Sequence, residues 1–138
     1  MKRTSQLLAL ALAPLLTSFF TSCAVAAVGA AVGAGYIISQ QVLPNNVHVA
    51  QVALDVDKVW PSVKETVGFY QDAGSEPSVQ DFPRTVLAKV NGSKVTVEVE
   101  AVDLDRTQIR VTAEKYLGKD DATAAKVMNA IVERLDKE

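Results

Sequence analysis

The sequence predicts an α+β fold, a two-layer sandwich in which a four-stranded, mostly antiparallel sheet carries two helices on one face. Two segments repeat apolar residues at helical spacing, and a third alternates apolar and polar residues as a half-buried strand does. Asn91-Gly92 separates two β-patterned segments, and this dipeptide is a strong hairpin signal because both central turn positions need positive φ. The expected order in residues 47–138 is strand, helix, three-stranded meander, helix (β-α-β-β-β-α).

The domain is expected to begin with a strand at 47–54 and to continue into a helix. Asp55 or Asp57 is the expected N-cap, because its carboxylate can accept hydrogen bonds from the free N–H groups of the first turn. Pro61 has no N–H, so regular α-geometry is expected to begin near Trp60; Gly74-Ser75 should end the helix, and Pro77 should begin a loop. The apolar stripe of this helix consists of Val59, Trp60, Val63, Val67 and Tyr70.

The meander consists of strands at 84–90, 93–103 and 107–116. In the middle strand one set of alternate residues should face the helices: Val95, Val97, Val99 and Ala101. The last helix should begin after Asp120 or Asp121, with a stripe of Ala124, Val127, Met128, Ile131, Val132 and Leu135. Because one helix joins the first two strands, the first strand should run parallel to the second and the fourth, at either edge of the sheet. The outer sheet face should meet water or a partner.

The first 22 residues have the features of an export signal. Lys2 and Arg3 form a positive start, and Leu7–Phe20 is an apolar stretch of 14 residues, too short for a stable span. Phe20-Thr21-Ser22-Cys23 resembles the lipobox of bacterial lipoproteins, in which cysteine becomes the acylated first residue. Two or more acyl chains suffice for stable anchoring in a membrane. The sequence therefore predicts lipidation of Cys23; the alternative is an ordinary secretory signal cleaved near Ala24-Val25-Ala26.

Cys23 is the only cysteine, so an internal disulfide is excluded. Ala24 after the cysteine resembles the sorting signal of Gram-negative outer-membrane lipoproteins, which predicts a periplasm-facing anchor in that membrane. Cleavage before Cys23 removes Lys2 and Arg3 and leaves 12 basic and 16 acidic residues. Such a mildly acidic chain with no basic cluster is a poor candidate for binding nucleic acid.

Residues 23–46 form an apolar, Ala/Gly-rich segment with no charge. It is interpreted as a membrane-proximal tether. Gly29, Gly33 and Gly35 also allow a second reading, a helix that enters the bilayer or self-associates, because small residues at this spacing let two helices approach closely. Pro44-Asn45-Asn46 is expected to be a hinge into the folded domain.

Three short motifs accompany these features: Asp57-Lys58-Val59-Trp60, Thr107–Val111 and Tyr116–Asp120. Together with the lipobox cysteine, the Ala/Gly-rich segment and the order of elements, they resemble a family of small bacterial lipoproteins of uncharacterised function. The resemblance covers nearly all of the chain after Cys23. It implies location and architecture and the absence of catalysis.

The sequence offers little for catalysis. His48 is the only histidine, and a structural or exposed imidazole is the favoured interpretation. Asp103 and Asp105 flank a turn, and Asp120 and Asp121 precede a helix, so each has a sufficient structural role. We expect no enzyme activity, no cofactor and no metal site. The predicted function is a lipid-anchored envelope protein that docks on another protein or stabilises an assembly. The alternative is a periplasmic module that binds a lipid or another amphiphile between helices and sheet.

Overall fold

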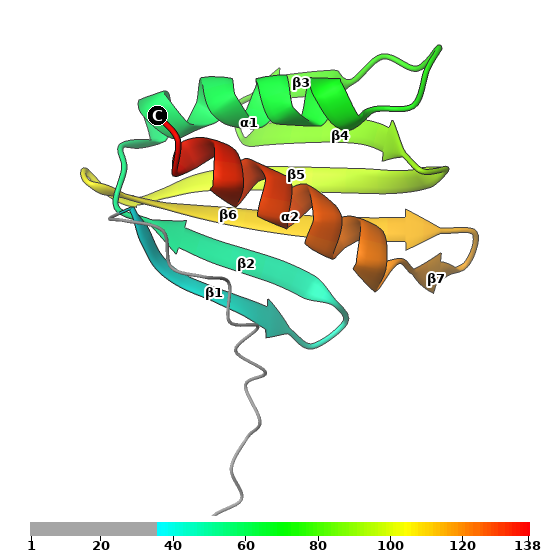
Figure 1. Ribbon diagram of the computed structural model, residues 1–138, viewed down its shortest axis with the longest axis horizontal. Helices are drawn as coiled ribbons and strands as arrows, with labels where there is room; N and C mark the ends of the chain where they lie inside the picture. Colours follow the sequence, from blue (N-terminus) through cyan, green and yellow to red (C-terminus); the bar gives the residue numbers. More distant parts are fainter. Residues whose placement is uncertain (1–35) are drawn as a thin grey trace, which may run out of the picture.

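Two helices lie on one face of a seven-stranded sheet in the computed structural model, which describes residues 36–138 (Figure 1). The α+β class and the placement of both helices on one face are confirmed. The elements, in chain order, are β1 (Ile37–Leu43), β2 (Val47–Val52), α1 (Val56–Tyr70), β3 (Ser78–Asp81), β4 (Arg84–Val90), β5 (Ser93–Asp103), β6 (Arg106–Lys115), β7 (Gly118–Lys119) and α2 (Asp121–Leu135).

The strand order is β1-β2-β6-β5-β4-β3, with the short β7 paired to β6, and neighbouring strands run antiparallel. The prediction of four strands is therefore wrong, because β1, β3 and β7 are added. The predicted direction of the first strand is also wrong, since β2 runs antiparallel to β6. The segment after Pro77, expected to be a loop, contains β3. This extra strand reverses the chain once more between α1 and β4.

Residues Pro44, Asn45 and Asn46 connect the two strands of a hairpin, in which Leu43 pairs with Val47. The expected hinge at this point is wrong. Asn45 and Asn46 both have left-handed backbone conformations, with φ of 66° and 57°. Asparagine adopts this conformation more readily than most residues other than glycine, which suits it to a reversal of the chain. The sheet thus begins at Ile37, within the segment assigned to the tether from the sequence.

Helix α1 begins with Asp55 as its N-cap, whose carboxylate accepts a hydrogen bond from the N–H of Asp57. The helix includes Pro61, so the expected start near Trp60 is wrong; it ends at Tyr70, before the expected Gly74-Ser75. A proline at this position removes one donor, the one that would bond to the carbonyl of Asp57. Burial of the α1 stripe holds the first turn against the sheet in spite of that loss.

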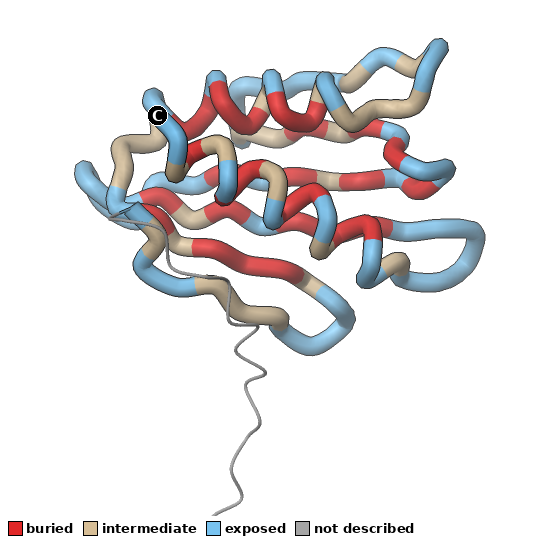
Figure 2. The backbone as a smooth tube through the Cα atoms, viewed as in Figure 1, coloured by how far each residue is buried: buried red, intermediate tan, exposed pale blue. Residues whose placement is uncertain are grey.

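The core lies between the sheet and the two helices. Figure 2 shows buried segments along the central strands and along the helix sides that face them. Helix α1 packs on β4 and β5, and α2 packs on β6 and β2. The predicted inward residues of β5 are buried at Val95, Val97 and Val99, but Ala101 is exposed, which corrects that prediction. The ladder between β5 and β6 becomes irregular just after Ala101, where the strands extend toward their turn.

Candidate interaction surface

The sheet face turned away from α1 and α2, here called the open face, carries no helix of the described residues (Figure 1). Alternate residues of each strand point to opposite faces, so the residues between the core positions belong to this surface. Its members along the five longest strands include Ser39, Gln41, Leu43, Val47, Val49, Gln51, Thr85, Leu87, Lys89, Lys94, Thr96, Glu98, Glu100, Gln108, Arg110, Thr112 and Glu114.

One row across the open face is uncharged, and we call it the central row: Leu43, Val47, Thr112, Thr96 and Leu87. Leu43 pairs with Val47, Thr112 with Thr96, and Thr96 with Leu87. Val47 lies beside Thr112, because the next pair in that ladder joins His48 to Val111. Leu43 is 36% exposed and the other four are partly buried. The row gives the open face a continuous apolar and β-branched band from β1 to β4.

Charged residues border the central row on both sides. On one side Arg110 faces Glu98, with 3.9 Å between Nη1 and Oε2. On the other side Lys94 faces Glu114, and Glu114 also forms an ion pair with Lys119. The hydrogen bond from Lys119 lowers the pKa of Glu114 below its ordinary value. An uncharged centre with a charged and polar rim is typical of a protein–protein interface.

Val49 is buried on the open face, with only 2% of its surface exposed, although it lies outside the core cluster. Its cross-strand partners are Gln41 and Arg110. The long stems of such side chains can cover an apolar neighbour while their polar ends stay in water. The open face around Val49 therefore exposes little apolar surface, and the central row beside it exposes more.

Two grooves open on this face. The first has a volume of about 460 Å³ and is lined by residues that include Phe82, Arg84, Glu98, Glu100 and Arg110. Phe82 is 85% exposed, and the Arg84 guanidinium lies 6.0 Å from its ring centre. The second groove, of about 530 Å³, lies at the other end of the strands and contains Leu87, Lys89 and Tyr116 among its lining residues. Both grooves adjoin the central row.

His48 is 4% exposed and its Nε2 lies 2.8 Å from Oδ1 of Asp121, the first residue of α2. In the described part of the chain this carboxylate is the hydrogen-bond partner of the ring. The contact ties β2 to the start of α2, which fits the structural interpretation of His48. It brings no hydroxyl or thiol nucleophile to the imidazole.

The other predicted aspartates have structural contacts. Asp103 binds Arg106 across the β5–β6 turn and accepts from the N–H of Asp105, and the hydrogen bond to Arg106 lowers the pKa of Asp103. Asp120 caps α2. It accepts from Ser93 Oγ at 2.5 Å and from the N–H and hydroxyl of Thr123, and these bonds lower its pKa, the one from Ser93 most. Within residues 36–138 there is no cluster of three or more His, Cys, Asp or Glu side chains for a metal.

Cys23, the predicted lipidation site, and Gly29, Gly33 and Gly35, the predicted helix-association residues, lie outside the described residues. The predicted signal peptide and its cleavage site do so as well. Among residues 36–138, no helix is both long and apolar enough to cross a bilayer. Tyr36, the first described residue, accepts a hydrogen bond from the N–H of Ala53 through its backbone carbonyl. The strand registers place it at the sheet end where β5 turns into β6.

That end of the sheet also carries exposed apolar side chains. Ile38 and Leu104 line a surface hollow of about 470 Å³ together with Asp103, Asp105 and Arg106. Leu104, at the tip of the β5–β6 turn, is 86% exposed. Single exposed apolar residues are ordinary, but here Ile38 and Leu104 lie together at the start of β1.

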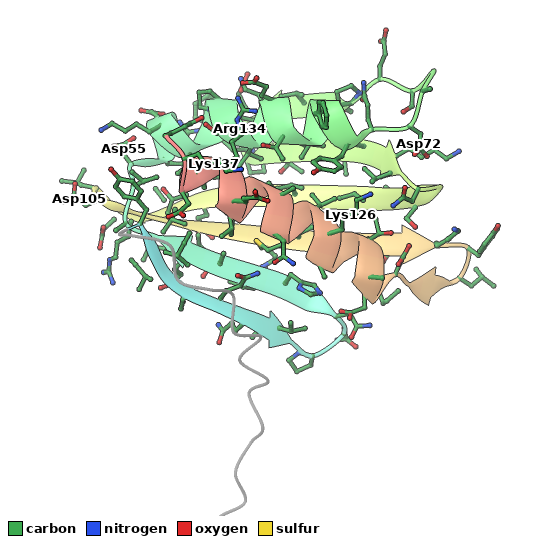
Figure 3. The ribbon with its side chains drawn as sticks, viewed as in Figure 1. Asp55, Asp72, Asp105, Lys126, Arg134 and Lys137 are labelled. Carbon is green, nitrogen blue, oxygen red and sulfur yellow. The ribbon has the colours of Figure 1, made fainter. Side chains whose placement is uncertain are left out.

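Sequence reasoning missed Asp72, which Figure 3 labels beside the turn between β4 and β5. Its two carboxylate oxygens accept from the N–H groups of Asn91 and Gly92, at 2.7 and 2.8 Å. Asn91-Gly92 predicts the hairpin from the sequence, and φ of 53° and 77° confirms the turn. A residue 19 positions earlier that holds the turn gives no local signal. Strand β1 is missed for a different reason: from the sequence, its residues are assigned to the tether.

Comparison with models of known protein families finds no match to this chain, and comparison of the sequence with curated proteins finds none either.

Proposed function

We propose that the protein is a non-catalytic, lipid-anchored protein of the bacterial cell envelope that binds another envelope protein through the central row. The partner surface is expected to be uncharged and apolar at its centre and polar at its edge. The observation that carries the proposal is the central row itself: a partly buried, uncharged band, bordered by charged residues, on a sheet face that carries no helix of the described residues.

The sequence supports the membrane part of the proposal. The lipobox-like Phe20–Cys23 and the residue after it favour an acylated Cys23 in the outer membrane, facing the periplasm. Cys23 precedes Tyr36 by 13 residues, so a fully extended connection reaches at most roughly 45 Å. A partner would therefore be another protein in or close to the same membrane, and the short reach would raise its effective concentration near the open face.

The central row supports the interaction part. Interface centres are depleted in charged residues, and their rims are polar and wet. Thr96 and Thr112 lie at the middle of the row, with a leucine at each end of it. A partner that covers these residues removes apolar surface from water and leaves the ion pairs of the rim solvated. That arrangement avoids the desolvation penalty of a buried charge.

The alternative function is binding of a lipid or amphiphile between helices and sheet, and residues 36–138 offer no observation in its favour. The valines that would line such a site belong to one buried cluster with the helix residues, including Val97, Val111, Val127 and Met128. A bound chain would have to displace these contacts. The two open-face grooves contain carboxylates and cationic groups, which do not suit an acyl chain.

Site-specific photocrosslinking in cells tests the proposal. A photoreactive residue at Thr96 or Thr112 is expected to give the same crosslinked product, and Lys126 on the exposed side of α2 is the control position. Leu87→Glu, which introduces a charge at one end of the central row, is expected to abolish the product while the folded domain keeps its protease resistance. A product that is equal at Lys126, or unchanged by Leu87→Glu, would contradict the proposal, as would no product at either threonine.

A further inference from the structure

Strand β1 is an edge strand of the described sheet and carries few of the usual features that prevent pairing. One side bonds to β2, so the backbone N–H and C=O groups on the other side have no strand to bond within the described sheet. The strand, Ile-Ile-Ser-Gln-Gln-Val-Leu, contains no charged residue and no proline. Natural edge strands are commonly blunted by charges, prolines, bulges or short length.

The opposite edge shows these protections. Strand β3 has four residues, ends in Asp81, and lies between Pro77 and Pro83. Strand β1 has seven residues and one such device, an irregularity between Ile37 and Ser39 that leaves 39–43 regular. The two edges of one sheet therefore differ in their capacity to add a strand, and β1 is the one open to pairing.

The residue pattern of β1 indicates which strand would fit. Apolar residues lie at both ends, Ile37-Ile38 and Val42-Leu43, and polar residues 39–41 lie between them. A two-fold contact needs a surface that complements itself. Opposite residues of an antiparallel pair share a face, so a residue of one copy can oppose only residues of the same parity in the other.

Among the allowed registers, the axis at Gln40 matches the pattern best. It places Gln40 opposite Gln40, Ser39 opposite Gln41, and Ile38 opposite Val42. An axis at Gln41 would instead oppose Ser39 to Leu43 and Gln40 to Val42, polar against apolar. The register centred on Gln40 pairs like with like and brings no charges together.

We propose that two copies of the protein pair antiparallel through β1, with Gln40 of one copy opposite Gln40 of the other. The two sheets then form one continuous sheet, with both pairs of helices on the same side and the two open faces joined. The two central rows, which begin at Leu43 of each copy, then lie on opposite sides of the axis, each displaced from it by three residues along β1. The contact is one strand wide and falls below the size of a stable standard interface, so it needs a raised local concentration. This last step rests on the proposed anchoring at Cys23.

Disulfide trapping in membranes of cells that produce the full chain tests the pairing. In antiparallel pairs opposite Cα atoms are roughly 4.5–5.5 Å apart, within the range that a disulfide accepts. After mild oxidation, Gln40→Cys is expected to form dimers in roughly ten-fold excess over Gln80→Cys on the other edge, because only facing Cβ atoms meet disulfide geometry. Two differently tagged chains, Ser39→Cys and Gln41→Cys, are expected to give the mixed dimer and little of either homodimer. The unaltered chain reports any disulfide formed by Cys23.

The variants decide for or against the pairing, and the unaltered chain separates the pairing from the anchoring. A Gln40→Cys dimer that falls several-fold on addition of Val42→Lys supports it. Equal dimer from Gln40→Cys and Gln80→Cys indicates collision and overturns it. If Gln40→Cys forms crosslinks only with a different protein, the proposal that a second copy pairs with β1 is wrong. If Gln40→Cys loses protease resistance, the Ser39→Cys and Gln41→Cys pair decides instead, and absence of its mixed dimer overturns the proposal. Dimers of the unaltered chain indicate a bare Cys23 thiol and count against the anchoring alone.

Discussion

Asp72 stabilises the β4–β5 turn through hydrogen bonds, and the structure allows the loss of stability on its replacement to be predicted. Asp72 lies just after α1, and its carboxylate accepts from both N–H groups of the Asn91-Gly92 turn. The backbone N–H of Asp72 also donates to the carbonyl of Lys89, at 2.6 Å. Replacement of Asp72 by alanine removes the two side-chain bonds and leaves the backbone bond in place.

The expected loss comes from those two bonds. Hydrogen bonds to charged groups contribute about 1.5–3 kcal/mol when desolvated and less where water can replace them, as at this exposed turn. About 1 kcal/mol for each bond gives about 2 kcal/mol for Asp72→Ala. For a domain of this size, that loss corresponds to a fall of about 8–16 °C in Tm. Asp72→Asn keeps one acceptor oxygen and is expected to lose about half as much.

Denaturant and thermal unfolding followed by circular dichroism would measure the effect. Asp105→Ala is the matched control, because Asp105, labelled in Figure 3, lies in another two-residue β-turn, between β5 and β6. Its carboxylate makes no hydrogen bond or ion pair among the described residues. If Asp72→Ala were no less stable than Asp105→Ala, the reasoning that the carboxylate holds the turn would be refuted.

Three further predictions concern the sheet edge, the anchor of β3 and the cap of α2. A chain that begins at residue 47 loses the six residue pairs between β1 and β2. At 0.2–1 kcal/mol for each pair, its free energy of unfolding should be lower by roughly 1–6 kcal/mol than that of a chain of residues 36–138. Equal denaturant midpoints for the two chains would contradict this. Trp60→Phe removes the bond of 2.8 Å from Nε1 to Asp81 and should cost about 1–3 kcal/mol by circular dichroism, a cost that should disappear in an Asp81→Ala background. The bonds from Ser93 and Thr123 lower the pKa of Asp120, so its carboxylate should stabilise the fold above the ordinary value of 3.8 and lose this effect as pH falls through the lowered pKa. Asp120→Asn should therefore be less stable than the unaltered chain at neutral pH, and a gap in Tm that persists well below pH 3.8 would be inconsistent with this.

The parts of the fold that follow from local patterns were predictable. The stripes of both helices are buried where their spacing places them, except that Tyr70 is only partly buried. The Asn91-Gly92 turn has the positive φ values that its residues favour. The caps Asp55 and Asp120 were each one of two predicted alternatives. These features depend on interactions within a few residues, and such interactions leave a signal in the sequence.

The parts that depend on distant pairing were not predictable to the same degree. Strand β3 is four residues long, is exposed throughout and has a proline on each side, so its sequence is typical of a loop. Strand β1 follows an apolar Ala/Gly-rich segment, and its polar middle was assigned to the tether. Asn45-Asn46 was the available signal, since two asparagines after a proline favour a tight reversal as much as a hinge. The missing β3 then led to the wrong direction for β2.

The candidate surface was predictable in outline only. Alternation in β5 and β6 predicts a polar outer face, but the central row combines residues from five strands whose order the sequence does not give. Leu43 and Val47 enter it only because β1 and β2 pair beside β6. A row of this kind depends on the register of the strands, because a shift of one residue would move the side chains of a strand to the other face of the sheet.

The intact mass of the protein extracted from membranes tests the central claim, anchoring through Cys23, most directly. The extracted chain is expected to begin at Cys23 and to carry the added mass of acyl groups, and a Cys23→Ser variant is expected to carry no such mass. A bare Cys23 thiol, or a chain that still carries residues 1–22, would contradict it.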